Sequence, residues 1–213
     1  MGYLPNFIFL ILLAVGGGFF TRNIFQIRRN ILLGKDADRN DRKSKRWGHM
    51  LRIAFGQSKL GTKPLAAFLP FVVYIGFVLI NIELLEIVLD GLLGTHRIFA
   101  PLLGGFYGVL IGSFEILAVS VIGAVMVFWA RRNLLKIKRF WKPEMQGWPK
   151  RDADLILYFE IVLMLLFLSM NAADSLLQQR GVEAYIQTAD FPISQFLHPL
   201  FEGFSERTLI ILE

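Results

Sequence analysis

Several carboxylates lie within or at the end of long apolar stretches, where ionisable side chains are rare. Glu83, Glu86 and Asp90 recur at spacings of three and four residues, so they share one face of a helix. Glu115 and Glu160 each stand among apolar neighbours. A carboxyl group that is buried without a partner has a raised pKa and can exchange protons near neutral pH. These residues therefore predict either proton-transfer chemistry or a structural role, as hydrogen-bonded carboxyl groups between helices.

The other residues that could do chemistry are three histidines, His49, His96 and His198, since the chain has no cysteine. Without thiolates the chain supplies no ligands for an iron–sulfur cluster or for Cys-bound zinc. No histidine falls inside an apolar run, whereas a bis-histidine haem in a helical bundle needs imidazoles that project inward. His96, in the string GTHR, is the one candidate for contacting a haem or a quinol. The alternative is an interfacial histidine that caps a helix beside Arg97. The sequence predicts no metal site and no complete catalytic centre.

The elements that must position these residues follow from composition. Of the 213 residues, 54% are hydrophobic and 19% are charged, whereas soluble proteins average about 45–50% and about 25%. The apolar residues gather in runs of the length that a membrane-spanning helix needs, about 20 residues. The sequence therefore predicts an all-α membrane bundle and excludes a disordered chain, a disulfide-stapled secreted domain and a soluble nucleic-acid-binding protein. The predicted spanning helices cover about 4–25, 65–90, 101–130 and 154–174.

The basic residues predict the orientation. Twenty of the 23 Lys and Arg residues lie within 22–63 and 131–151. Loops rich in Lys and Arg stay in the cytoplasm, so we expect the N-terminus and the segment 175–207 to lie outside. The first apolar run precedes its positive charges, unlike a cleaved signal peptide, and is expected to be retained. An apolar run at 208–212 predicts the start of a fifth helix, and hence a fragment of a longer chain.

A short basic segment in the first cytoplasmic loop has the pattern of an amphipathic helix over 45–56. Its apolar residues follow helical spacing, and its basic residues lie largely off that stripe; the stripe consists of Trp47, Met50, Leu51, Ala54 and Phe55. Such a helix is suited to the headgroup region of a membrane. The alternative is that it docks on a soluble partner domain.

Four strings carry a family resemblance: NILLGKDADR (30–39), GFVLINIELLEIVLDGLLGTHRIFAPLLGGFY (76–107), ARRNLLKIKRFWKPEMQGWPKRDADLIL (130–157) and MNAAD (170–174). They resemble the N-terminal membrane domain of bacterial membrane-bound (Fe-S)-binding oxidoreductases, which are heterodisulfide-reductase-like. That domain in turn resembles the gamma (cytochrome b) subunit of respiratory nitrate reductase. The resemblance covers nearly the whole chain, and His96 falls in its GTHR string. The resemblance implies further helices and a cytoplasmic domain with cysteine motifs for [4Fe–4S] clusters, in addition to these 213 residues.

The resemblance implies a membrane anchor and quinone-facing electron-transfer domain in the bacterial cytoplasmic membrane. Its partners would be membrane lipid and an iron–sulfur domain or redox subunit on the cytoplasmic side. Glu115, Glu83, Glu86 and Glu160 are then the proton or quinol candidates. Relatives tend to carry a histidine near the start of the second helix, where this chain reads FLPF (68–71), so haem b in this chain stays open. The alternatives are a non-catalytic anchor or assembly subunit of a respiratory complex and, less favoured, a small transporter, which would show internal repeats.

Overall fold

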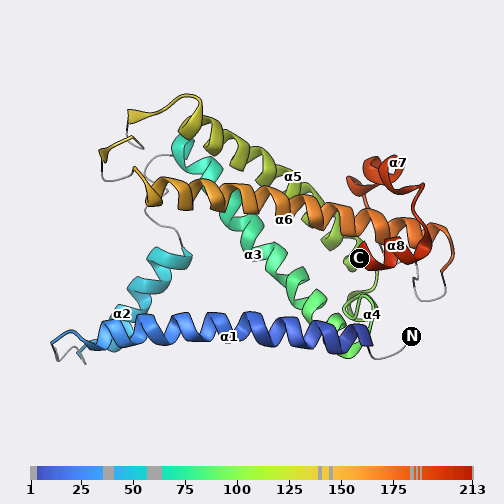
Figure 1. Cartoon of the computed structure of the whole chain (residues 1–213), viewed down its shortest axis with the longest axis horizontal. Coiled ribbons are helices and arrows are strands. Elements are labelled where there is room, and N and C mark those ends of the chain that lie inside the picture. The colour runs from blue at the N-terminus through green and yellow to red at the C-terminus, as the bar shows by residue number, and fades with distance from the viewer. Residues whose placement is uncertain are drawn as a thin grey trace. The chain divides into compact units, whose positions relative to one another are not determined.

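Four long helices dominate the computed structural model, which describes residues 4–35, 41–56, 64–138, 141–143, 146–182, 185, 187 and 189–212. They are α1 (Leu4–Leu32), α3 (Pro64–Leu93), α5 (Gly105–Asn133) and α6 (Trp148–Gln179) (Figure 1). Each is long and apolar enough to cross a membrane. The predicted all-α fold with four spanning helices is therefore confirmed, and its length and composition are those of a multi-pass membrane protein.

Three of the four long helices, α1, α3 and α6, are longer than the ranges expected from the sequence. In α1, the helix continues beyond residue 25 to Leu32 and so takes in Arg28 and Arg29. The predicted third helix over 101–130 is divided at Gly104, whose φ is +52°, into the short α4 (Ala100–Leu103) and α5. The fourth helix reaches Gln179 and so includes the first residues of the predicted outside segment. Parts of that segment, 183–184, 186 and 188, lie outside the described residues.

The chain divides into two units, and α3 contributes to both of them. The first unit is Met1–Ala67 with Ile87–Thr95. Within it, the start of α1 packs on the end of α3: Asn6 Nδ2 donates to Gly91 O at 2.9 Å. A Cβ on Gly91 would lie 2.7 Å from the Phe9 ring, so glycine permits this close approach. No described residue of α1 is buried, which suits a helix whose apolar side chains face lipid.

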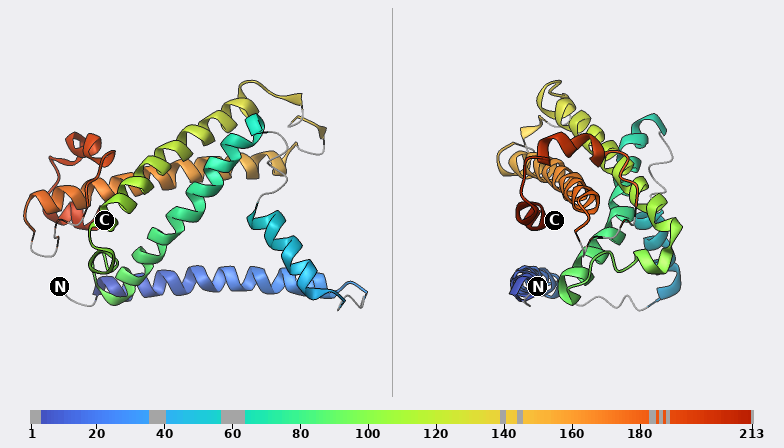
Figure 2. Two further views of the ribbon diagram at one scale, coloured as in Figure 1. Left: turned by 180° about the vertical axis from the view of Figure 1, so that it is seen from behind. Right: turned by 90° about the vertical axis from the view of Figure 1, so that its right-hand side faces the viewer.

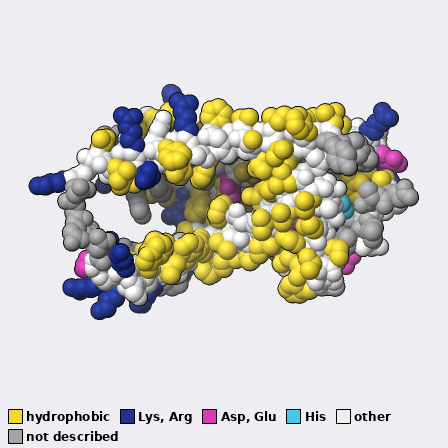
Figure 3. Space-filling view, turned by 90° about the horizontal axis from the view of Figure 1, so that it is seen from below, with side chains coloured by type: hydrophobic (Ala, Val, Ile, Leu, Met, Phe, Trp, Pro, Cys, Tyr) yellow, Lys and Arg dark blue, Asp and Glu magenta, His cyan; other side chains and the backbone are white. Residues whose placement is uncertain are grey.

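The segment expected to be amphipathic is helical, as α2 (Lys43–Met50) followed by a π-helical turn, η1 (Leu51–Phe55). All residues of 41–56 are exposed, including Trp47 and Phe55 of the apolar stripe. In the space-filling view hydrophobic side chains cover much of the long helices, and most of the visible Lys and Arg side chains lie toward helix ends (Figure 3). This distribution is the one that a membrane-spanning helix requires.

The second unit is Phe68–Glu86 with His96–Glu213. Here α5 and α6 pack side by side (Figures 1 and 2). Their shared core consists of Ile111, Phe114, Ala118, Val121, Val125, Met164, Phe167 and Leu168. The spacing of three and four residues places each set on one face of its helix. A Cβ on Gly76 would lie 2.6 Å from Val121 Cγ2, so the absence of a side chain lets α3 approach α5 closely.

The described residues after α6 form short helices that pack against its end. They are η5 (Ser194–Leu197), α7 (His198–Phe201) and α8 (Glu206–Leu212). Leu209 of α8 is buried with Ala173 and Leu177 of α6. Arg180 donates to the carbonyl oxygens of Glu202 and Phe204, at 2.7 and 2.9 Å. The apolar run at 208–212, expected to begin a fifth helix, is therefore helical and lies against α6.

Candidate functional site

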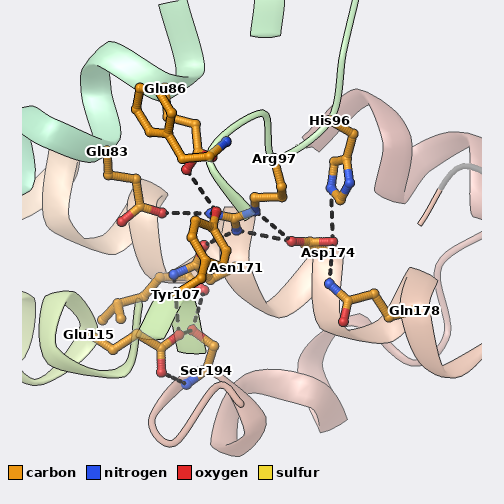
Figure 4. Close-up of polar contacts among 12 residues, drawn as sticks. Glu83, Glu86, His96, Arg97, Tyr107, Glu115, Asn171, Asp174, Gln178 and Ser194 are labelled. Carbon is orange, nitrogen blue, oxygen red and sulfur yellow. Dashed lines mark hydrogen bonds and ion pairs between the residues drawn. The ribbon is translucent and has the colours of Figure 1, made fainter. Parts of the chain in front are cut away.

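A buried cluster of charged and polar side chains lies in the second unit, where α3, α5, α6 and the connection before α4 meet (Figure 4). All of its central residues are buried. We call it the Arg97 cluster; it consists of Glu83, Glu86, Arg97, Tyr107, Glu115, Asn171, Asp174 and Ser194, with His96 and Gln178 at its edge. Since isolated charges are costly in an apolar interior, the partners of each group decide what the cluster can do.

The residues of the Arg97 cluster come from different parts of the chain, and helix spacing and one turn bring them together. Glu83 and Glu86 are three residues apart on α3, as are Asn171 and Asp174 on α6, so each pair shares a helix face. Arg97 lies in the connection that follows α3, where Gly94 and Arg97 both have positive φ, +71° and +55°. These left-handed residues reverse the chain, and Arg97 returns to the face of α3 that carries both glutamates.

The guanidinium group of Arg97 joins the helices. Its Nη1 donates to Glu83 Oε1 at 2.9 Å, and its Nη2 donates to Asp174 Oδ2 at 2.9 Å. Further bonds run from Nε to Asp174, from Nη2 to Asn171 Oδ1 at 2.8 Å and from Nη1 to Tyr107 Oη at 3.3 Å. Burial by itself lowers the pKa of Arg97, but the charges of Asp174 and Glu83 outweigh burial and raise it above its ordinary value. Arg97 is therefore a fixed positive charge.

Glu86 fixes the connection and α5 to α3. Its Oε1 accepts a hydrogen bond from the backbone N–H of Phe99 at 2.9 Å, and its Oε2 accepts one from Tyr107 Oη at 2.7 Å. Each carboxylate oxygen of Glu86 thus has a donor. Because one of these donors is a backbone N–H next to α4, Glu86 holds the loop that carries Arg97 in place.

His96 lies at the edge of the cluster and is paired with Asp174. Its Nε2 is 3.2 Å from Asp174 Oδ1, and its side chain is 21% exposed. The ring also packs against Tyr185, with centroids 4.6 Å apart. Asp174 accepts a further bond from Gln178 Nε2 at 2.9 Å. The pair gives His96 the arrangement of a general acid or base, an imidazole oriented by a carboxylate.

Glu115 is hydrogen-bonded on both carboxylate oxygens rather than isolated among apolar side chains. Its Oε2 accepts the backbone N–H groups of Ile193 and Ser194 at 2.7 and 3.2 Å. Its Oε1 accepts bonds from Ser194 Oγ and from Asn171 Nδ2, the latter at 3.3 Å. Through these hydrogen bonds, Glu115 fixes the segment before α7 to α5 and α6.

These contacts form one continuous network in the second unit. Starting from His96, it runs through Asp174, Arg97 and Asn171 to Glu115. Glu160 does not belong to it, because it precedes Asp174 by 14 residues on α6, which is about 21 Å along a helix axis. Of the sequence candidates, the structure therefore brings together Glu83, Glu86, Glu115 and His96, and leaves Glu160 apart.

The sequence analysis missed the central member, Arg97, and its partners; these are Tyr107, Asn171, Asp174 and Ser194. A signal for Arg97 was present: it is the single basic residue between 64 and 130. A lone arginine between two apolar runs, on the side from which basic residues are otherwise depleted, is typical of a residue with a carboxylate partner. Ser194, by contrast, has no distinguishing pattern in the sequence.

A hollow of about 430 Å³ lies beside the cluster. It is lined by His96, Arg97, Ala100, Pro101, Gly104, Gly105 and Gln187. The absence of side chains at Gly104 and Gly105 leaves space next to His96 and Arg97. A second hollow of the same size is lined mainly by polar side chains, among them Gln178, Gln195 and His198. A ligand in the first hollow would meet one imidazole, one guanidinium group and an apolar wall.

The residues do not fit a bis-histidine haem. His49 lies on α2, His96 lies in the connection after α3, and His198 begins α7, so none lies on a spanning helix. Within the described part of the chain, no group of three or more His, Asp and Glu side chains has the arrangement of a metal site.

Comparisons of the chain with protein-family models, with curated proteins and with solved structures gave no match. The fold and the site therefore define the class by themselves: a helical multi-pass membrane protein with a buried, charged hydrogen-bond network.

Proposed function

We propose that this chain is the quinone-facing membrane domain of an oxidoreductase whose electrons are exchanged with an iron–sulfur domain or subunit. One observation supports this function best. His96 lines a hollow on one side, and on the other side it is paired with Asp174, a member of the buried network. Quinone chemistry couples each pair of electrons to two protons, so a quinone site needs a group that accepts or donates protons at the headgroup. Histidine is suited to this because its pKa lies near neutrality.

Quinol oxidation at this site proceeds through His96. A quinol in the hollow gives its first proton to the imidazole of His96, which releases that proton to water before it accepts the second one. The carboxylate of Asp174 stabilises the imidazolium that forms, and the two electrons pass to the iron–sulfur domain or subunit through a redox group that the partner would supply. Arg97 keeps Asp174 ionised, because the guanidinium group is bonded to it through Nε and Nη2. The reverse sequence reduces a quinone.

The test is turnover of the complex purified with its partners from the native membrane. His96→Gln should lower quinol oxidation by at least about a hundredfold, as is typical for loss of a general acid or base, and should leave assembly intact. His49→Gln, on the exposed α2, is the matched control and should retain activity. Normal turnover of a well-assembled His96→Gln complex would contradict the role of His96. A wild-type complex without quinol turnover would instead favour the non-catalytic anchor.

We further propose the orientation that the basic loops predict, with the Arg97 cluster toward the outside of the bacterial cytoplasmic membrane. A reporter fused after Lys45 or after Lys142 should report the cytoplasm, and one fused after Arg180 should report the outside. A cytoplasmic signal at Arg180 would contradict this orientation, and protons from a quinol would then be released on the other side.

A further inference from the structure

The four carboxylates of the Arg97 cluster outnumber its permanent positive charges. Glu83, Glu86, Glu115 and Asp174 are all buried, and Arg97 is the one guanidinium group bonded to them among the described residues. If all four carboxylates were ionised and His96 neutral, the cluster would carry three uncompensated negative charges. Buried charge of that size is strongly unfavourable, and such groups are neutralised by taking up protons or cations.

The hydrogen bonds distinguish the four carboxylates. Asp174, Glu115 and Glu86 each have donors on both oxygens. Those donors stabilise an ionised carboxylate. Glu83 differs: its Oε1 accepts a bond from Arg97 Nη1, whereas its Oε2 has no hydrogen-bond partner among the described residues.

The surroundings of Glu83 are fully enclosed. Its side chain is 0% exposed. The titratable and charged groups around it are Glu86 on its own helix, Arg97 from the connection, Tyr107 and Glu115 from α5, and Asp174 from α6 (Figure 4). Of these groups, only Arg97 carries a positive charge, and it is shared with Asp174. If Glu83 were ionised, its Oε2 would therefore be a buried, charged oxygen without a hydrogen-bond partner among the described residues.

We propose that Glu83 is the proton-binding group of the cluster and carries one proton at neutral pH. A protonated Glu83 still accepts the Arg97 hydrogen bond through its carbonyl oxygen and removes one of the uncompensated charges. This assignment concerns the chain alone, and it holds whether or not a quinone occupies the hollow. Of the proton candidates named from the sequence, Glu115 has donors on both carboxylate oxygens, whereas Glu83 does not.

Infrared spectroscopy of the purified chain in detergent tests this assignment directly, because a protonated carboxyl group has a carbonyl band that a carboxylate lacks. At neutral pH, Glu83→Gln should remove intensity that corresponds to one protonated carboxyl group per chain. Glu86→Gln and Glu115→Gln are the matched controls, as buried glutamates of the same cluster, and should keep that intensity. Glu83→Asp should retain the band at a shifted frequency.

The stability of Glu83→Gln supplies a second measurement. Glutamine has the shape of a protonated glutamate and can accept the same hydrogen bond from Arg97, so the variant should fold and keep the unfolding temperature of the wild type at neutral pH. An unchanged carboxyl band in Glu83→Gln would overturn the assignment, as would failure of this variant to fold. The assignment would also be overturned if the carboxyl band of the wild type appeared only after sodium was removed. Glu83 would then bind a monovalent cation instead of a proton. None of these outcomes depends on quinol turnover.

Discussion

Two buried arginines of the second unit have similar exposure, 5% for Arg97 and 8% for Arg132, but different partners. Arg97 contacts two carboxylates and belongs to a network with more acids than bases. Arg132, near the end of α5, forms one ion pair among the described residues, with 2.9 Å between its Nε and Asp154 Oδ1. Its Nη2 donates to the carbonyl oxygens of Lys150 and Pro149, at 3.0 and 3.5 Å. The charges at Arg132 therefore balance, whereas those at Arg97 do not.

The contacts around Arg132 indicate a structural role, in which they hold α5 and α6 together. Trp141 Nε1 donates to the Arg132 carbonyl oxygen at 3.1 Å, and Asn133 Nδ2 donates to Asp154 Oδ1 at 3.2 Å. The ammonium group of Lys150 lies 4.2 Å from the centroid of the Trp141 ring, a cation–π contact. These contacts fix the start of α6 to the end of α5. Burial of an arginine therefore does not by itself indicate a chemical site, whereas an excess of carboxylates around the arginine does.

The largest effect is expected for Arg97→Met. This substitution leaves Asp174 and Glu83 buried without their common partner, and loss of one member of a buried ion pair costs about 3–5 kcal/mol. The free energy of unfolding in detergent, measured with a chemical denaturant, should fall by that amount. A loss below about 1 kcal/mol would show that both carboxylates are already protonated. The charges around Arg97 would then be balanced, as they are around Arg132.

A smaller effect is expected for Arg132→Met. Asp154 is 18% exposed on its side chain, so water can replace part of the lost interaction, and the remaining bonds are to backbone carbonyl oxygens. Loss of hydrogen bonds to a charged group costs about 1–3 kcal/mol. Arg131→Met, at the neighbouring and less buried position, is the control and should change the unfolding free energy by about 0.5 kcal/mol or less. A loss at Arg132 larger than that at Arg97 would reverse the comparison.

The smallest effect is expected from pH at His198, which begins α7 near the segment bound by Glu115. Partial burial lowers the pKa of His198 below its ordinary value of 6.5, although the charges of Glu202 and Glu115 oppose that shift. The unfolded chain therefore binds a proton more readily than the folded one, and stability is lost as the pH falls below 6.5. His198→Gln should remove that part of the acid dependence in unfolding measurements. An unchanged slope would show that His198 does not contribute to it.

The sequence determined which segments are helices and which residues share a helix face. Runs of about 20 apolar residues can satisfy their backbone hydrogen bonds in a membrane only as helices, which is why four spanning helices were predicted correctly. The spacing of Glu83 and Glu86 placed them on one face for the same local reason. The sequence also singled out His96 and Glu115, because ionisable residues are rare in or beside apolar runs.

The tertiary structure alone decided which of these residues meet. Arg97 is 77 residues from Asp174, and Glu115 is 79 residues from Ser194. Such pairs depend on how α3, α5 and α6 pack and on the left-handed turn at Gly94 and Arg97, and helical periodicity carries no information about either. Glu115 and Glu160 look alike in the sequence, each a single acid among apolar neighbours. They differ because the chain at the start of η5 folds back onto α5 and offers the backbone N–H groups of Ile193 and Ser194 to Glu115, a contact between distant parts of the chain.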